Sequence, residues 1–415
     1  MECSISIFLD TRREKEKEGY PLKLRVYSNR LKKAKLYPVD MDLTIEEFQR
    51  IWKSERPRTE YKEKRIKLKS IESKANEVAE SIIPFSFADF EKKLFRRAGD
   101  GDNVFYHYEV TIQRFQSLER YGTASNYNLS LKSLKDFIIY KKHKEPKKLS
   151  FLEITSDWLT NYETYMINHK KRSRTTVSMY LRALRTIFNI AINEKEIEQE
   201  IYPFGKRKYQ VPTVKNVKKA LAKEELKILF EAEPQTPEQK KAKDFWFFSY
   251  ACNGVNIKDI ALLKWANLKN DKIVFYRAKT INTSKADLRP VTVYLNDFTK
   301  SIIETYGNSN LEQEQLIFPF IAGGLNEIES FKKIKNFTRS INQNLKKLAV
   351  DNGLSSEIST YWARHSFATN AIRSGASMEF VSEALNHSNL RTTQGYFAGF
   401  EEKDKKELMK NIMNF

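Results

Sequence analysis

YWARHSFATNAIRSGASMEFVSEALNHSNLRTTQGYF, residues 361–397, is the stretch that decides how this chain is read. It holds an arginine at the opening of a predicted helix (Arg364), then a histidine (His387), and nine residues later a tyrosine (Tyr396). That interval has room for a turn and a short helix, so the histidine and the tyrosine can face the same site. These three side chains are the candidate functional residues from which the rest of the chain is interpreted.

The residue types suit nucleophilic attack on a phosphodiester. A tyrosine hydroxyl, with a pKa of about 10, is a poor nucleophile until its proton is taken or its target is polarised. Charge builds on the non-bridging oxygens in the transition state, and a bidentate guanidinium such as that of Arg364 stabilises it. His387 can hydrogen-bond the same phosphate, and Lys279, expected at the end of a strand, can protonate the leaving 5′-oxygen. The predicted catalytic residues are Tyr396, Arg364, His387 and Lys279.

The positive charge of the chain, +20 in total, is concentrated in two regions. Counting Lys and Arg against Asp and Glu, residues 1–150 carry +10 and residues 201–300 carry +10, whereas 151–200 and 301–415 each sum to zero. An excess that served solubility alone would be spread more evenly. The distribution indicates a nucleic-acid surface built from separate modules; the alternative is a generally basic protein with solvated lysines.

Cysteine and histidine usage predicts neither a disulfide framework nor a metal site. Cys3 and Cys252 lie far apart, and the five histidines follow no metal-ligand spacing. No cofactor is expected. The N-terminus lacks the pattern of a signal peptide, and no apolar stretch approaches membrane-spanning length. We therefore expect a cytoplasmic, nucleoid-associated chain with no membrane partner. The most apolar segment, 245–248, is expected to be part of a buried helix.

The pattern of the sequence predicts a fold that is mainly α with small β elements. Residues 1–85 open with three short alternating runs, at 4–9, 20–27 and 35–39, which predict an antiparallel meander. A helical stretch from about Thr44 to Ala79 follows it. Residues 86–202 repeat apolar side chains at helical spacing and predict a compact bundle.

Residues 203–220 are predicted to be a basic linker. Its first seventeen residues hold six cations and no anion, which suits a strap around a duplex or an ordinary solvated linker. Residues 221–415 return to helices, interrupted by a hairpin pattern at 272–279 and 289–295. They end in a charged tail helix from 402 with a narrow apolar stripe, formed by Leu408, Met409, Ile412 and Met413.

The order of these motifs resembles the tyrosine recombinase (phage-integrase) family. Arg364 to Thr369, Leu385 to Ser388 and Thr392 to Tyr396 are similar to its C-terminal signature. Residues 254–265 resemble its first catalytic box, and 278–280 its hairpin lysine. The resemblance implies an arm-type DNA-binding domain at 1–85, a core-binding (SAM-like) domain at 86–202 and a mixed, mostly α catalytic domain at 221–415. It points to a divergent subfamily, like the integrases of conjugative elements and the DNA invertases.

The family's chemistry implies a specific reaction and specific partners. Tyr396 would form a 3′-phosphotyrosyl link and free a 5′-hydroxyl, and the 5′-hydroxyl of a second duplex would then attack that link without metal or ATP. A homotetramer on two double-stranded DNA sites would integrate, excise or invert DNA through a Holliday junction. The tail helix would pack on a neighbouring protomer, and DNA-bending accessory proteins could assist.

Two positions depart from the family pattern. Asn256 stands where the first box has arginine, and Tyr361 stands where the second has histidine. Lys258 or Arg289 could supply the missing charge, and His365 could assist or be structural. Because Arg364, His387, Tyr396 and Lys279 are all present, the sequence favours an active enzyme with rearranged donors. The alternative is a catalytically weakened accessory or regulatory protein that binds DNA. A nuclease would need paired carboxylates and Mg²⁺, which the motif region does not offer.

Overall fold

The computed structural model describes most of the chain, and its contacts separate it into two compact units. The first unit comprises Met1–His107, Pro146–Thr155 and Ile187–Tyr202, and the second comprises Tyr108–Glu145, Ser156–Thr186 and Pro203–Phe415. The division runs through the predicted helical bundle, so the domain limits drawn from the sequence stay predictions. The described residues are 2–12, 19–95, 99–213, 219–281, 289–321, 323–400 and 402–411.

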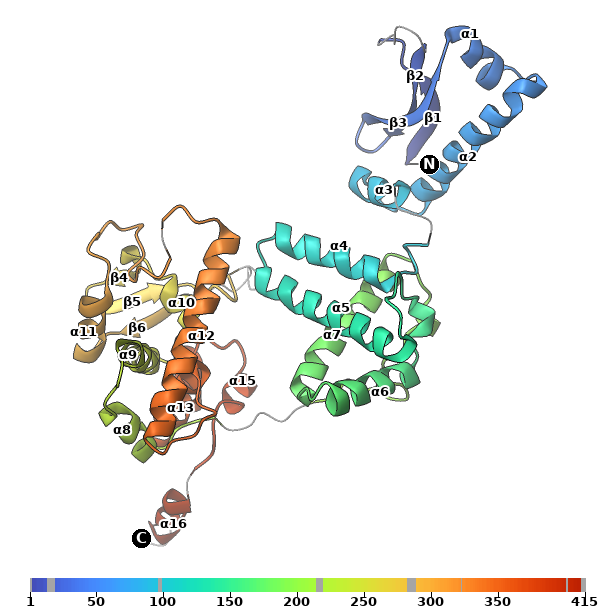
Figure 1. The fold of residues 1–415 in the computed structure, drawn as a ribbon. Coiled ribbons are helices and arrows are strands. Elements are labelled where there is room, and N and C mark those ends of the chain that lie inside the picture. The colour runs from blue at the N-terminus through green and yellow to red at the C-terminus, as the bar shows by residue number, and fades with distance from the viewer. Residues whose placement is uncertain are drawn as a thin grey trace. The chain divides into compact units, whose positions relative to one another are not determined.

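The N-terminal region is the predicted three-stranded antiparallel meander, in the order β1-β2-β3. Its strands are β1 (Cys3–Leu9), β2 (Tyr20–Ser28) and β3 (Lys33–Leu43). Side chains alternate between the two faces of the sheet, and one face packs into a core that contains the buried side chains of Leu22, Leu24 and Leu43. The helix α2 (Lys62–Glu80) lies along this face of the sheet, and α3 (Phe87–Leu94) lies near its end (Figure 1).

The helical stretch predicted from Thr44 to Ala79 is broken. Thr44 caps a short helix, α1 (Ile45–Phe48), through a capping box with Glu47, and a single π turn, η1 (Gln49–Lys53), extends it. Residues 54–58 then leave the helix. Pro57 explains the break, because proline has no backbone N–H and disfavours a helical residue before it. A short turn, η2 (Thr59–Tyr61), precedes α2.

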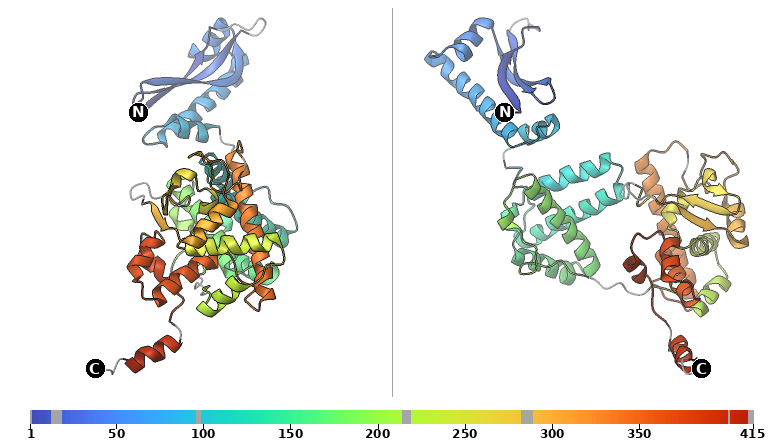
Figure 2. Two further views of the ribbon diagram at one scale, coloured as in Figure 1. Left: turned by 90° about the vertical axis from the view of Figure 1, so that its left-hand side faces the viewer. Right: turned by 180° about the vertical axis from the view of Figure 1, so that it is seen from behind.

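The predicted helical bundle is present. Tyr108 of α4 (Val104–Ser117) and Tyr127 of α5 (Tyr121–Lys142) pack edge to face at 6.0 Å, and the hydroxyls of Tyr108 and Ser130 lie 2.7 Å apart. The helices α4 and α5 run side by side in the views of Figures 1 and 2. The other elements of this region are η3 (Phe151–Glu153), α6 (Ser156–Thr164), η4 (Tyr165–His169), α7 (Arg174–Asn193) and η5 (Gln199–Ile201).

The first half of the predicted linker is ordered and packed. The Tyr209 hydroxyl donates to a carboxylate oxygen of Glu163 at 2.6 Å, and Phe204 and Tyr209 are buried. Residues 214–218 of the linker lie outside the described residues. The basic strap therefore starts as part of the folded structure.

The C-terminal region is built around one buried helix, α9 (Pro237–Ala251), as the 245–248 patch predicted. Phe245, Trp246 and Phe248 have no exposed surface. Each such side chain contributes roughly 1.5–3 kcal/mol to folding. The other elements are α8 (Lys223–Glu231), α10 (Ile257–Ala261), η6 (Trp265–Asn267), α11 (Asp297–Tyr306), α12 (Glu327–Asp351), α13 (Thr360–Arg373), α14 (Met378–Ala384), α15 (Leu390–Gln394) and α16 (Glu402–Asn411).

The predicted hairpin is present but shorter than the sequence pattern. Strands β5 (Lys272–Phe275) and β6 (Val291–Tyr294) pair antiparallel, and a two-residue strand, β4 (Leu268–Lys269), adds a third. In the tail helix α16, Met409 is exposed, whereas the side chains of Leu408, Ile412 and Met413 lie outside what the structure describes. Among the described residues, no helix combines the length and apolar character needed to cross a membrane.

Candidate active site

Arg364 lies on the first turns of α13 with only 3% of its surface exposed. The helix is anchored to the core because Trp246 Nε1 donates to the Ser359 carbonyl at 3.0 Å. The guanidinium of Arg364 donates to the backbone carbonyls of Gly254, at 3.1 Å, and Leu385. Its Nε has no hydrogen-bond partner within the described residues. The guanidinium is therefore fixed in place with donor capacity unused.

Gly254 makes the position of Arg364 possible. It follows α9 in a left-handed conformation, with φ at +67°. A Cβ at this residue would meet Cα of Arg364 at 2.5 Å and its Cβ and Cγ at 2.9 Å. Such approaches are far closer than van der Waals contact, so only glycine lets the two segments meet.

His387 is held between Arg364 and α15. Nη2 of Arg364 lies 3.0 Å from Nε2 of His387, and Nδ1 of His387 lies 3.0 Å from Oγ1 of Thr393. Because a guanidinium can only donate, Nε2 accepts, and the proton of the neutral ring is assigned to Nδ1. Burial, followed by the charges of Arg364 and Arg277, lowers the pKa of His387 to about 3. The imidazole is therefore neutral near pH 7.

Tyr396 follows α15, whose N-terminus is capped by Asn389, and its ring is enclosed by the other candidates. The ring stacks on His365 at 4.5 Å, lies 5.1 Å from the ring of His387, and has Cζ of Arg364 at 5.5 Å. Its backbone carbonyl lies 3.3 Å from Nδ1 of His365. The structure thus brings Tyr396, Arg364 and His387 together, and it gives His365 a contact that positions the tyrosine.

The hydroxyl of Tyr396 meets the hydroxyl of Tyr361, one of the two departures from the family pattern. The two oxygens lie 2.7 Å apart, and either can donate. Burial, and then the hydrogen bond to Tyr396, raises the pKa of Tyr361 above its ordinary value. Tyr361 is therefore a neutral hydrogen-bond partner of the candidate nucleophile at physiological pH.

Asn256, the other departure, is placed at the start of α10, where its backbone carbonyl accepts from Asp259 and Ile260. Its side chain makes no capping hydrogen bond within the described structure. The two cations proposed to replace the missing arginine, Lys258 and Arg289, are both exposed. Neither side chain is buried in the site as Arg364 is.

A cation that sequence reasoning passed over, Arg277, lies at the site instead. Its side chain is 11% exposed, and Nη1 donates to the Leu385 carbonyl at 3.5 Å, the same carbonyl that Arg364 uses. Burial and then the charge of Arg277 lower the pKa of Arg364 to about 10, so the guanidinium of Arg364 remains charged at neutral pH. Its place two residues before Lys279 is the nearest sequence signal, but that signal does not say that the side chain enters the site.

The sequence predicted Lys279 at the end of a strand, and this prediction is wrong. Strand β5 ends at Phe275, and Lys279 sits exposed in the turn at 278–280. The strand stops early because the backbone N–H of Ala278 donates to the buried carboxylate of Asp259 at 2.9 Å, which takes this segment out of the sheet. The charge of Lys279 also contributes to the lowered pKa of His387, so the lysine lies at the edge of the site.

Acid should destabilise the fold in part through His387. A histidine in the unfolded chain titrates near pH 6.5, so between about pH 3 and about 6.5 the unfolded state binds more protons. The free energy of unfolding should therefore fall as the pH is lowered through that window. We expect His387→Gln to flatten this fall, as measured by chemical denaturation at about pH 5 and about pH 7. Burial also lowers the pKa of His107 and His365, so only part of the fall should disappear. An unchanged pH dependence in the variant would contradict the expectation.

Comparisons with known proteins identify the family. Two family models match the chain over more than half its length: the phage integrase SAM-like domain at residues 103–211 and the phage integrase family at residues 219–403. Tyrosine recombinase XerC of Halalkalibacterium halodurans is 25% identical over 285 residues, covering 66% of this chain and 86% of the relative. Tyrosine recombinase XerA of Thermococcus kodakarensis is 27% identical over 228 residues, covering 54% of this chain and 71% of the relative.

Solved structures share the fold. XerH recombinase bound to a palindromic difH substrate aligns with a TM-score of 0.50 at 16% identity, over 83% of this chain and 94% of that one. The integrase of the Tn1549 transposon, in complex with circular intermediate DNA, also aligns with a TM-score of 0.50, at 13% identity, over 74% of this chain and 99% of that one. These similarities concern the fold, and the family models and sequence relatives carry the assignment: this chain belongs to the tyrosine recombinase (phage integrase) family of site-specific DNA recombinases.

Proposed function

We propose that Tyr396 is the nucleophile of this recombinase. Its hydroxyl oxygen would bond to the scissile phosphorus and lose its proton to water as the bond from phosphorus to the 5′-oxygen breaks. Lys279, exposed at the edge of the site, would give its proton to that leaving oxygen. The product is a 3′-phosphotyrosyl link, which the 5′-hydroxyl of a second duplex reverses. The observation that carries this proposal is the contact of the Tyr396 ring with Arg364 and His387. Arg364 and His387 lie 23 residues apart along the chain, and the fold brings their side chains within 3.0 Å of each other.

Arg364 would bind the scissile phosphate. Its guanidinium is positioned by two backbone carbonyls, and the donor that Nη2 gives to His387 could turn to an incoming phosphate oxygen. Fixed donors aimed at developing charge need no reorganisation when the reaction occurs, which makes them effective in catalysis. His387 would hydrogen-bond the same phosphate in its other tautomer, with the proton on Nε2 and with Nδ1 accepting from Oγ1 of Thr393.

The test is a suicide substrate, a labelled duplex nicked close to the scissile phosphate so that the freed 5′ end diffuses away. The proposed reaction traps the protein covalently on the 3′ end, and the adduct survives denaturing electrophoresis. Because neither ATP nor a metal takes part, the adduct should form equally well in the presence of a chelator. A chain that binds the duplex but leaves no adduct would be the accessory protein considered above.

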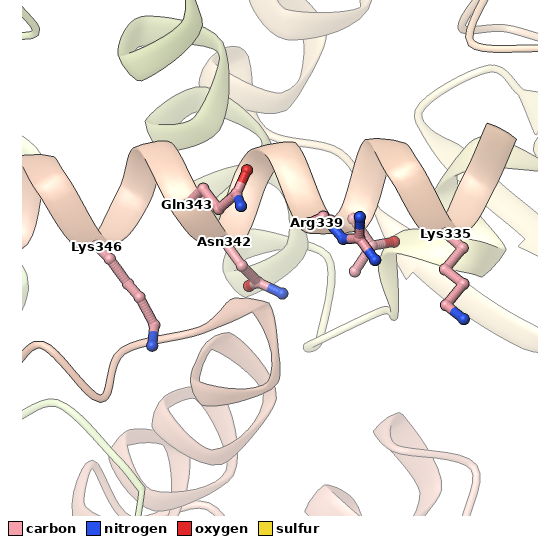
Figure 3. A pocket seen from close by; sticks show the side chains of 6 residues that line it. Lys335, Arg339, Asn342, Gln343 and Lys346 are labelled. Atoms are coloured by element: carbon pink, nitrogen blue, oxygen red, sulfur yellow. The ribbon is translucent and has the colours of Figure 1, made fainter. Parts of the chain in front are cut away.

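The basic face of α12 is proposed to hold the DNA beside this site. Six side chains at helical spacing line a shallow hollow of about 480 Å³: Lys335, Thr338, Arg339, Asn342, Gln343 and Lys346 (Figure 3). The opposite face of the helix is buried through Ile341, Leu345 and Leu348. Oδ1 of Asn342 accepts from the backbone N–H of Thr360 at 2.7 Å, which joins this face to the start of α13. A polyanion lying along α12 would thus reach Tyr361 and its partner Tyr396.

Removing two cations from this face should weaken DNA binding in a salt-dependent way. Each phosphate contact contributes a slope of about −0.9 in the logarithm of the binding constant against that of the salt concentration. We expect Arg339→Ala combined with Lys346→Ala to reduce the slope by about 2, as measured by fluorescence anisotropy across a salt series. The matched control changes Lys227 and Lys300, two exposed lysines on α8 and α11. Equal slopes for the two double variants would refute the assignment.

The N-terminal meander is proposed to be the arm-type DNA-binding domain. Strand alternation puts Leu22 and Leu24 into the core, so Lys23 and Arg25 point to the other face. Lys23 pairs with Phe8 and Arg25 pairs with Ser6 across the sheet. A sheet face that presents cations between small or flat side chains suits contact with a DNA groove.

The assembly is proposed to be a homotetramer on two double-stranded DNA sites, with DNA-bending proteins as further partners. The support is the family assignment, together with the DNA complexes in which XerH and the Tn1549 integrase were solved. Integration, excision and inversion share the same chemistry at Tyr396 and differ in the arrangement of the sites. Acting on chromosomal DNA would place the protein with the nucleoid in the cytoplasm.

A further inference from the structure

We infer that Arg277 supplies the second phosphate-binding guanidinium of the site, in place of the arginine that the family carries where this chain has Asn256. The inference rests on the proposed function, since it assigns a role in the same cleavage step. Arg277 comes from the turn after β5, and the residue it replaces lies at the start of α10.

The first support is the position of Arg277 beside Arg364. Both donate to the carbonyl of Leu385, Arg364 through Nη2 and Arg277 through Nη1 at 3.5 Å. Leu385 lies two residues before His387. A single backbone oxygen thus holds two guanidinium groups next to the histidine that would face the phosphate.

The second support is that a buried carboxylate holds the side chain of Arg277 in place. Asp259, which is 5% exposed, has its Oδ2 4.0 Å from Nε of Arg277 and accepts from the neighbouring backbone N–H of Ala278 at 2.9 Å. A buried carboxylate that contacts both the side chain and the following peptide fixes the direction of the guanidinium. An arginine merely crossing the surface would lack such a partner.

The third support is the balance of charge. Among the residues that the structure describes, the buried carboxylate at Arg277 is that of Asp259, a single negative charge beside two guanidinium groups, which leaves net positive charge close to Tyr396. The influence of Arg277 reaches the site, because its charge lowers the pKa of both Arg364 and His387. Two like charges in a poorly solvated place cost free energy unless an anion joins them. A phosphodiester that gains charge in its transition state is such an anion.

Asn256 cannot fill this role, and the charges of Lys258 and Arg289 are weakened by their exposure to water. An amide can hydrogen-bond a phosphate but cannot neutralise it. Arg277 is the cation that combines burial, a carboxylate partner and a carbonyl shared with Arg364.

The experiment compares cleavage by Arg277→Ala and the parent on two suicide substrates. One carries the normal phosphodiester, and the other carries a methylphosphonate, in which a methyl group replaces one charged non-bridging oxygen. We expect Arg277→Ala to form the covalent adduct about 10²- to 10³-fold more slowly on the phosphodiester. On the neutral methylphosphonate the two proteins should differ by less than about threefold, because there is little charge left to neutralise.

Two further variants separate this role from a structural one. Arg289→Ala, the matched exposed arginine, should cleave like the parent. Asn256→Arg added to Arg277→Ala should recover part of the lost rate, because it returns a guanidinium to the site from α10. Parent-like cleavage by Arg277→Ala, or an equal loss on both substrates, would overturn the role of Arg277 alone. A parent that forms no adduct on the phosphodiester would overturn the proposed function together with it.

Discussion

Tyr396→Phe should abolish covalent capture of DNA while leaving binding intact. The change removes one oxygen, the atom that would bond to phosphorus, and keeps the ring that stacks on His365 at 4.5 Å. Loss of a catalytic nucleophile lowers rates by about 10⁴- to 10⁶-fold in enzymes whose groups act as a unit. We therefore expect no adduct on a suicide substrate over hours, with DNA affinity within about twofold of the parent. Denaturing electrophoresis gives the first measurement, and fluorescence anisotropy gives the second.

Tyr361→Phe is the matched control, since the two hydroxyls lie 2.7 Å apart and either could be mistaken for the nucleophile. Removing the Tyr361 hydroxyl takes away one hydrogen bond of Tyr396, which is worth roughly 1 kcal/mol, so the rate should change by about tenfold or less. The outcome that would contradict the assignment is the reverse pattern, with an adduct in Tyr396→Phe and none in Tyr361→Phe.

Much of the fold could be predicted from the sequence because its signals are local. Alternation gave the three strands of the meander, and helical periodicity gave the bundle and the buried helix at 245–248. The boundaries were less accurate. Strand β5 ends at Phe275 rather than near Lys279, because a tertiary contact from Asp259 to the backbone of Ala278 draws the chain away. A buried carboxylate 19 residues upstream leaves no mark in a local pattern.

The candidate site shows the same division. Arg364, His387 and Tyr396 could be picked out because the order of their motifs resembles the family signature and because each side chain can attack or bind a phosphate. The structure brings them together. Arg277 could not, because its position depends on two distant acceptors, Asp259 and the Leu385 carbonyl. Residue type and spacing identify groups that can react, whereas a substitute donor is recognised only by where the fold carries it.

Gly254→Ala should cost activity nearly as much as losing Arg364, although residue 254 bears no reactive group. An added Cβ would meet Cα of Arg364 at 2.5 Å, so α13 or the turn after α9 must move. The Gly254 carbonyl also accepts from Nη1 of Arg364 at 3.1 Å, and a shift would break that contact. We expect the cleavage rate to fall by about 10²- to 10³-fold, the usual cost of displacing one donor from a developing oxyanion.

The control for this variant is Gly353→Ala, because Gly353 shares the left-handed backbone but not the crowding. Its φ is +72° against +67° at Gly254, and no heavy atom lies within 4 Å of the Cβ it would gain. The left-handed backbone strains the alanine in both variants by about 1–3 kcal/mol. Both variants should therefore have a lower free energy of unfolding in urea denaturation. Only Gly254→Ala should lose cleavage on the suicide substrate under conditions where both proteins are folded. Equal cleavage by the two variants would mean that Arg364 tolerates displacement, and the tight fit of Gly254 against α13 would then serve stability rather than the reaction.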